Sequence, residues 1–153
     1  MNKFDAKDIE INGKVYAVTK DGGIFMHSYT DQAGKIRKNK WVTHKVHPKT
    51  GRLMVGLNSL TGTRHTFYVH QVVMMAWGTP APEGMEQPTI DHINNDKLNN
   101  HIDNLQWMSH SDNVKKMWEA KTDEEKALMA NGASERFKEM HRNKDSRFKA
   151  YKN

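Results

Sequence analysis

The fold of this chain is decided by the stretch TIDHINNDKLNNHIDNLQWMSHSDN, residues 89–113. The stretch opens with an Asp91-His92 pair, places Asn104 twelve positions after the histidine, and ends with Asn113 nine positions further on. An Asp-His pair alone would occur by chance in many proteins. The joint pattern of Asp-His, Asn-Leu-x-Trp and a final asparagine at these spacings is much rarer, so it is the strongest signal in the sequence.

This run resembles the HNH (ββα-metal) endonucleases, and among them the phage homing and nicking enzymes in which asparagine replaces the last histidine. The three positions of the H-N-N variant read His92, Asn104 and Asn113 here. A Val-His-x-x-Val segment that begins at Val69 is also common in these nucleases, so the resemblance extends from about Val69 to Asn113. It implies a DNA endonuclease that hydrolyses phosphodiester bonds.

The resemblance also implies a local fold. A strand carries Asp91 and His92, a loop and a second strand follow, and a helix beginning near Ser109 returns Asn113 toward Asp91. The alternation in Leu105-Gln106-Trp107-Met108 suits the second strand. The apolar residues of the run are expected to form the core of the hairpin, namely Leu98, Ile102, Leu105 and Trp107.

Phosphodiester hydrolysis needs a deprotonated water and a group that absorbs charge on the departing 3′ oxygen. A histidine titrates near pH 6.5 in its unperturbed state, so His92 is the candidate general base. A neutral imidazole must present the correct nitrogen, and Asn104 is the candidate for orienting it, through a side-chain or backbone carbonyl.

Asp91 and Asn113 are the candidate metal ligands. Both offer oxygen atoms, which Mg²⁺ and Mn²⁺ prefer, and two protein oxygens leave positions for phosphate oxygens and water. We therefore expect one divalent cation per site, Mg²⁺ first and Mn²⁺ as the alternative. Asparagine in place of the usual last histidine argues against zinc or nickel.

Three other histidines lie close to these positions in the sequence. His70 could face the site, although a structural histidine is the preferred interpretation. His101 lies in a turn, and His110 lies three residues before Asn113, on a different face of the expected helix. Neither His101 nor His110 is assigned a catalytic role.

The chain as a whole predicts an α+β protein with four regions. Residues 1–78 form a small antiparallel β-rich region that ends in a short helix, and residues 79–88 form a linker that holds three of the four prolines. Residues 89–121 form the ββα-metal hairpin and helix. Residues 122–153 form a helical, basic tail, whose first helix opens with a Thr-Asp-Glu-Glu capping box.

Two basic segments are candidates for contact with DNA. The first combines four cations with an aromatic ring, and its alternative interpretation is a solvated strand edge; it comprises Lys35, Arg37, Lys38, Lys40 and Trp41. The second is the tail, whose alternative interpretation is a soluble terminus; its cations include Arg136, Lys138, Arg142, Lys144 and Arg147.

Composition is consistent with a nucleic-acid partner. The 153 residues include 24 Lys and Arg against 18 Asp and Glu, which gives a formal charge of +6. The chain has no cysteine, so it has no disulfide and no four-cysteine zinc knuckle. No apolar stretch is long enough to span a membrane. We expect a cytoplasmic protein, in a bacterial host if a phage encodes it.

Two functions from different classes remain open at this stage. The first is a metal-dependent endonuclease acting on double-stranded DNA. The second is a DNA-binding protein that kept the HNH scaffold without cleavage. A monomer with one site should nick one strand, whereas a homodimer on a two-fold symmetric site could cut both.

Overall fold

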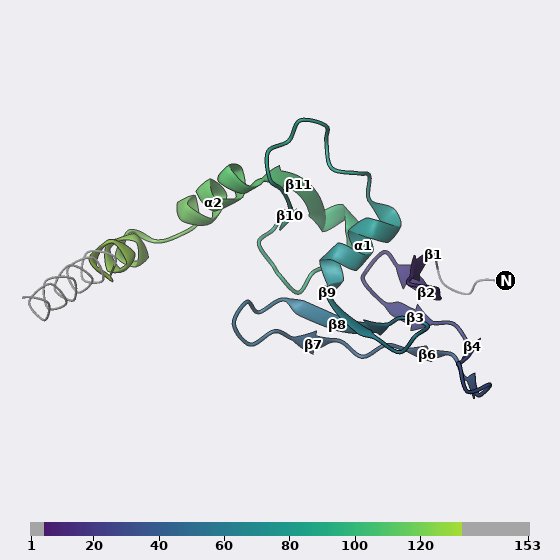
Figure 1. Ribbon diagram of the computed structural model, residues 1–153. Helices are drawn as coiled ribbons and strands as arrows, with labels where there is room; N and C mark the ends of the chain where they lie inside the picture. The colour runs from purple at the N-terminus through teal and green to yellow at the C-terminus, as the bar shows by residue number, and fades with distance from the viewer. Residues whose placement is uncertain (1–4, 133–153) are drawn as a thin grey trace, which may run out of the picture. The chain divides into compact units, whose positions relative to one another are not determined.

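The computed structural model describes residues 5–132, and the chain divides into one unit of residues 1–110 and a second of residues 111–153. The tail cations Arg136, Lys138, Arg142, Lys144 and Arg147 therefore lie outside the described residues. Figure 1 shows the elements in chain order by colour. The α+β class predicted from the sequence is confirmed, because antiparallel strands and separate helices make up the fold.

Within the part of the chain that the structure describes, nine strands precede the first helix. They are β1 (Ala6–Ile11), β2 (Lys14–Thr19), β3 (Ile24–Met26), β4 (Tyr29–Thr30), β5 (Ile36–Arg37), β6 (Lys40–Trp41), β7 (Lys45–Val46), β8 (Leu53–Asn58) and β9 (Arg64–Tyr68). One antiparallel sheet has the order β1-β2-β3-β6, a second has the order β7-β8-β9, and β4 pairs with β5. The small β-rich region expected from the sequence is thus present as several short sheets.

Helix α1 (Val69–Trp77) follows β9 directly and is the centre of the first unit. Figure 1 shows it between the N-terminal strands and the later β10–β11 hairpin, and it contacts β1, β2, β8, β9 and β10. Its apolar face supplies Val69, Val72 and Val73, all fully buried. The helix ends at Gly78, and residues 79–87 contain neither helix nor strand, which agrees with the proline-rich sequence there.

The hairpin consists of β10 (Pro88–His92) and β11 (Leu105–Ser109), joined by a loop that ends in the single 3₁₀ turn η1 (Ile102–Asn104). The two strands pair antiparallel with Asp91 opposite Gln106 and His92 opposite Leu105. Leu105 is buried, and Ile102 and Trp107 pack against the core. Leu98 is 52% exposed, so the expectation that it belongs to the hairpin core is wrong.

The β-rich region and the hairpin share one core within the first unit. Strand β2 alternates between buried and less buried residues, and it sends Tyr16 and Val18 inward beside Leu57 of β8. The Tyr16 hydroxyl donates to the carbonyl of Asn58 at 2.9 Å, which ties the first sheet to the second. The indole of Trp77 donates to the carbonyl of Val18 at 2.9 Å and fixes the end of α1.

In the second unit, α2 (His110–Glu119) begins at the last residue of the first unit and carries Asn113. Residues 123–132 are also helical. Glu125 donates its amide to the Thr122 hydroxyl at 3.2 Å, and its carboxylate accepts from the Thr122 amide at 2.9 Å. This is the capping box expected from the sequence. No helix among the described residues is long and apolar enough to cross a membrane.

Candidate active site

Asp91 and His92 end strand β10 and are both buried, with 6% and 3% of their surfaces exposed. Successive residues of a strand point to opposite faces, so the two side chains have different neighbours. Gln106, opposite Asp91 on β11, donates from Nε2 to the Asp91 carboxylate at 2.9 Å. This hydrogen bond fixes one carboxylate oxygen and helps offset the cost of burying the charge.

The imidazole of His92 lies beside Asn100, with His92 Nε2 at 3.1 Å from Asn100 Oδ1. Asn100 is 3% exposed, and its own Nδ2 donates to the Leu98 carbonyl at 3.1 Å. Asn100 and Gln106 were not among the site residues predicted from the sequence. Gln106 meets Asp91 because of the register of the hairpin, and Asn100 meets His92 because of the course of the loop. Residue spacing alone indicates neither contact.

His70 of α1 is the second ring in contact with His92. The centroids of the His70 and His92 rings are 5.1 Å apart at 71°, and the Tyr68 ring stacks on His70 with a centroid distance of 5.5 Å. His70 is 3% exposed, and its Nδ1 is buried without a hydrogen-bond partner. Burial, followed by the charges of Arg52 and His92, lowers the pKa of His70 to about 3. His70 is therefore a neutral, buried neighbour of the candidate base.

Asn104 organises the loop between the two strands. Its Oδ1 accepts from the Asn94 amide at 3.1 Å, and its Nδ2 donates to Asn94 Oδ1 at 2.9 Å and to the Asn99 carbonyl at 2.8 Å. Its backbone carbonyl accepts from the Ile93 amide at 2.8 Å, directly after His92. These contacts hold both ends of the loop together around the histidine.

Asn113 lies on α2 in the second unit, so its pairing with Asp91 on one ion stays a prediction. The residues described by the structure contain no group of three or more His, Asp or Glu side chains that could hold a metal ion. A metal site built around Asp91 would therefore depend on other oxygen atoms, such as an amide, phosphate or water oxygen.

The remaining two histidines have local roles. His101 Nδ1 accepts from the Asp103 amide at 3.2 Å and caps the 3₁₀ turn, which agrees with its interpretation as a loop residue. His110 begins α2 and is exposed.

Four of the five residues predicted for DNA contact in the N-terminal region line one groove. The groove has a volume of about 830 Å³, and its cations are Lys14, Lys35, Arg37, Lys38 and Lys40. Trp41 lies elsewhere, at the edge strand β6, where its ring packs edge-on against Phe25 at 5.3 Å. DNA contact by the cations and by Trp41 stays a prediction.

One acid, Asp31, lies in this groove. Its carboxylate accepts from the backbone amide of Lys35 at 2.9 Å and from Arg37 Nε at 2.9 Å. The hydrogen bond from the Lys35 amide is the largest cause that lowers the pKa of Asp31, with Arg37 adding to it. Asp31 therefore stays ionised and fixes the position of Arg37.

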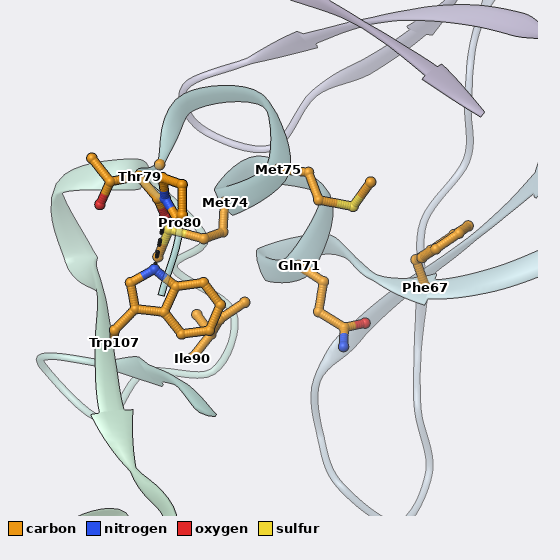
Figure 2. A pocket seen from close by; sticks show the side chains of 9 residues that line it. Phe67, Gln71, Met74, Met75, Thr79, Pro80, Ile90 and Trp107 are labelled. Atoms are coloured by element: carbon orange, nitrogen blue, oxygen red, sulfur yellow. Dashed lines mark hydrogen bonds between the residues drawn. The ribbon is translucent and has the colours of Figure 1, made fainter. Parts of the chain in front are cut away.

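A second pocket, of about 500 Å³, lies between α1 and the hairpin (Figure 2). It is lined by Phe67, Gln71, Met74, Met75, Gly78, Thr79, Pro80, Ile90 and Trp107. Figure 2 shows the indole nitrogen of Trp107 directed at Thr79, whose carbonyl accepts its hydrogen bond at 2.9 Å. The lining has no acid or base, so this pocket is not a candidate for hydrolytic chemistry.

Comparison with known proteins shows which family this part of the chain matches. The sequence profile described as HNH endonuclease matches residues 67–115. An uncharacterised HNH endonuclease of Acanthamoeba polyphaga mimivirus is 30% identical over 103 residues, which are 67% of this chain and 27% of the relative. A solved structure that describes DNA binding and cleavage by the HNH homing endonuclease I-HmuI aligns with a TM-score of 0.55 and 25% identity.

The alignment with I-HmuI covers 76% of this chain and 60% of the solved one, so the chain spans less than two thirds of either relative. The profile begins at Phe67, just before α1, and ends at Lys115, within α2. It therefore includes the buried Asp-His pair, the loop and the hairpin described above. On these matches residues 67–115 form a segment of the HNH endonuclease family, and both relatives are HNH endonucleases.

Proposed function

We propose that this protein is a divalent-metal-dependent endonuclease that hydrolyses phosphodiester bonds in double-stranded DNA, of the homing type. The observation that carries the proposal is the buried Asp91-His92 pair at the end of β10, in which Gln106 holds the carboxylate and Asn100 holds the imidazole. A positioned base and a carboxylate that can hold a cation are the two groups that metal-dependent hydrolysis of a phosphodiester uses.

In this proposal His92 accepts a proton from the attacking water. A neutral imidazole has one nitrogen without a proton, which is the atom that can act as the base. Asn104 keeps the loop closed around His92 through its contacts with Asn94 and Asn99. His92 keeps the role proposed from the sequence. Asn104 differs from its predicted role: its side-chain and backbone oxygens accept from the Asn94 and Ile93 amides, so it acts on the loop, and Asn100 contacts the imidazole.

Asp91 and Asn113 would hold the cation in this proposal. The donor chemistry fits Mg²⁺, with Mn²⁺ as the alternative, because both residues offer hard oxygen atoms. The hydrogen bond from Gln106 also fits, since ligating carboxylates are commonly oriented by a second group. When bound, such a cation stabilises charge on the departing 3′ oxygen.

The basic groove is the proposed contact with the DNA backbone. Its exposed cations are Lys35, Arg37, Lys38 and Lys40, whereas Lys14 is buried with its ammonium over the Tyr29 ring. The one acid in the lining, Asp31, is paired with Arg37. Lysine and arginine side chains neutralise phosphates without reading the base sequence. I-HmuI, with which this chain shares its fold, is described in binding and cleaving DNA. We include the tail cations in the proposal on their charge alone.

Incubation with supercoiled plasmid tests the proposal. The protein should convert the plasmid to nicked or linear form with Mg²⁺ or Mn²⁺ and leave it intact with EDTA. Mapping the ends distinguishes a nick made by one copy from a double-strand break made by a homodimer. Binding without cleavage at any concentration of either ion would favour a DNA-binding protein that retained the HNH scaffold. Phage origin and cytoplasmic location remain predictions from the sequence.

A further inference from the structure

The amide of Asn100 can be oriented in only one way. Its Nδ2 donates to the Leu98 carbonyl at 3.1 Å, and a flipped amide would bring two acceptor oxygens together there. The atom that faces His92 Nε2 at 3.1 Å is therefore Oδ1, which only accepts hydrogen bonds. The imidazole must then donate from Nε2.

We infer that Asn100 is a positioning residue that makes Nδ1 of His92 the nitrogen that accepts the proton of the attacking water. A neutral imidazole carries its one proton on Nε2 or on Nδ1, and the hydrogen bond to Asn100 favours Nε2. The unprotonated nitrogen is consequently Nδ1. This inference rests on the proposed nuclease function for its meaning, although the protonated nitrogen can be measured without activity.

The β2–β3 turn packs against Asn100. Gly22 in that turn has φ +94°, and a Cβ there would lie 3.4 Å from Asn100 Cβ and 2.8 Å from Val69 Cγ1. The next turn of the loop is anchored to the same segment, since the amide of Ile102 donates to the Lys20 carbonyl at 2.8 Å. The N-terminal sheet therefore supports the residue that orients the base.

Contacts made by His70 and Asn104 support this role of Asn100. His70 packs edge-on against the imidazole at 5.1 Å and restricts the room for the ring to turn. Asn104 Nδ2 donates to the carbonyl of Asn99, the residue before Asn100, so Asn104 stiffens the backbone that carries the orienting amide. Pre-organisation of this kind is what a positioned base requires.

The test uses ¹⁵N NMR of the His92 ring in the metal-free, full-length protein, at a pH where the imidazole is neutral. Wild-type protein should show the proton on Nε2. Asn100→Ala should show a mixture of both tautomers, because alanine offers no acceptor for a proton on Nε2. Asn94→Ala is the matched control: it removes the side-chain acceptor of Asn104 Nδ2 in the same loop, keeps the hydrogen bond from the residue 94 amide to Asn104 Oδ1, and leaves the contact between Asn100 and His92.

Plasmid nicking with Mg²⁺ supplies the second measurement. Asn100→Ala should lower kcat by about 10 to 100-fold with little change in KM. Asn94→Ala should keep the Nε2 tautomer even if it cuts more slowly. A wild-type His92 protonated on Nδ1, or Asn100→Ala with an unchanged tautomer and kcat, would overturn the inference. Absence of cleavage by every variant would instead refute the proposed function, because the NMR result does not depend on it.

Discussion

Replacing His70 by phenylalanine should remove a specific part of the pH dependence of folding stability. His70 is buried next to His92, and its pKa is lowered to about 3, chiefly by burial. In the unfolded chain a histidine titrates near 6.5. Between these two pH values His70 binds a proton in the unfolded chain but not in the folded protein.

The sign of the effect follows from proton linkage. Stability rises with pH wherever the unfolded state binds more protons, so His70 should cost stability as the pH falls from about 6.5 toward about 3. A pH of about 5 is about 1.5 units below the pKa of histidine in the unfolded chain, and each unit changes the free energy of unfolding by about 1.4 kcal/mol. His70 should thus destabilise the fold by about 2 kcal/mol at pH 5 and by almost nothing above pH 7.5.

Urea unfolding followed by tryptophan fluorescence measures this contribution. Wild type and His70→Phe are compared at about pH 7.5 and pH 5, with EDTA present, so that other titrating groups cancel in the difference. Phenylalanine keeps the aromatic contacts with Tyr68 and His92 but takes up no proton. Between about pH 7.5 and pH 5, the free energy of unfolding should fall by about 2 kcal/mol less in the variant than in wild type. His110→Gln, which removes an exposed histidine, serves as the control. An identical loss of stability in wild type and His70→Phe would refute the reasoning.

Three further predictions concern the ion, the groove and the hairpin. Asp91→Ala and Asn113→Ala should each raise the Mg²⁺ concentration needed for half-maximal cleavage, Asp91→Ala more strongly; an unchanged midpoint for Asn113→Ala would show that the ligand set is wrong. Replacing Lys38 and Lys40 together by alanine should reduce the slope of log affinity against log salt by up to about 1.8, and equal slopes would exclude both lysines from the contact. Trp107→Phe, which loses the hydrogen bond of the indole to the segment after α1, should lower the free energy of unfolding by about 1 kcal/mol, as measured in urea.

The parts that local pattern controls could be predicted from the sequence. The helix that starts at Val69 and stops at Gly78 follows from its apolar spacing and from the prolines after it. The strand that ends at Asp91 and His92 follows from the resemblance of the motif. In these cases the decisive information lies within a few residues of the element, so one sequence contains it.

The partners of the site could not be predicted in the same way. Asn100 meets His92 because a loop folds back on itself, and Gly22 meets Asn100 because the β2–β3 turn packs against that loop. Both contacts depend on tertiary packing. The spacing of these residues along the sequence does not indicate that they meet. Leu98 shows the same limit: it is apolar and was expected in the core, but its backbone serves a polar turn and its side chain is half exposed.

Comparison of wild type with His92→Ala tests the central claim most directly. Both proteins are assayed for binding to the same duplex in EDTA and for nicking of supercoiled plasmid in Mg²⁺. If His92 is the general base, the alanine variant should bind DNA as wild type does and cut it about 10² to 10⁴-fold more slowly. A variant that cuts at the wild-type rate would contradict the assignment of the active site.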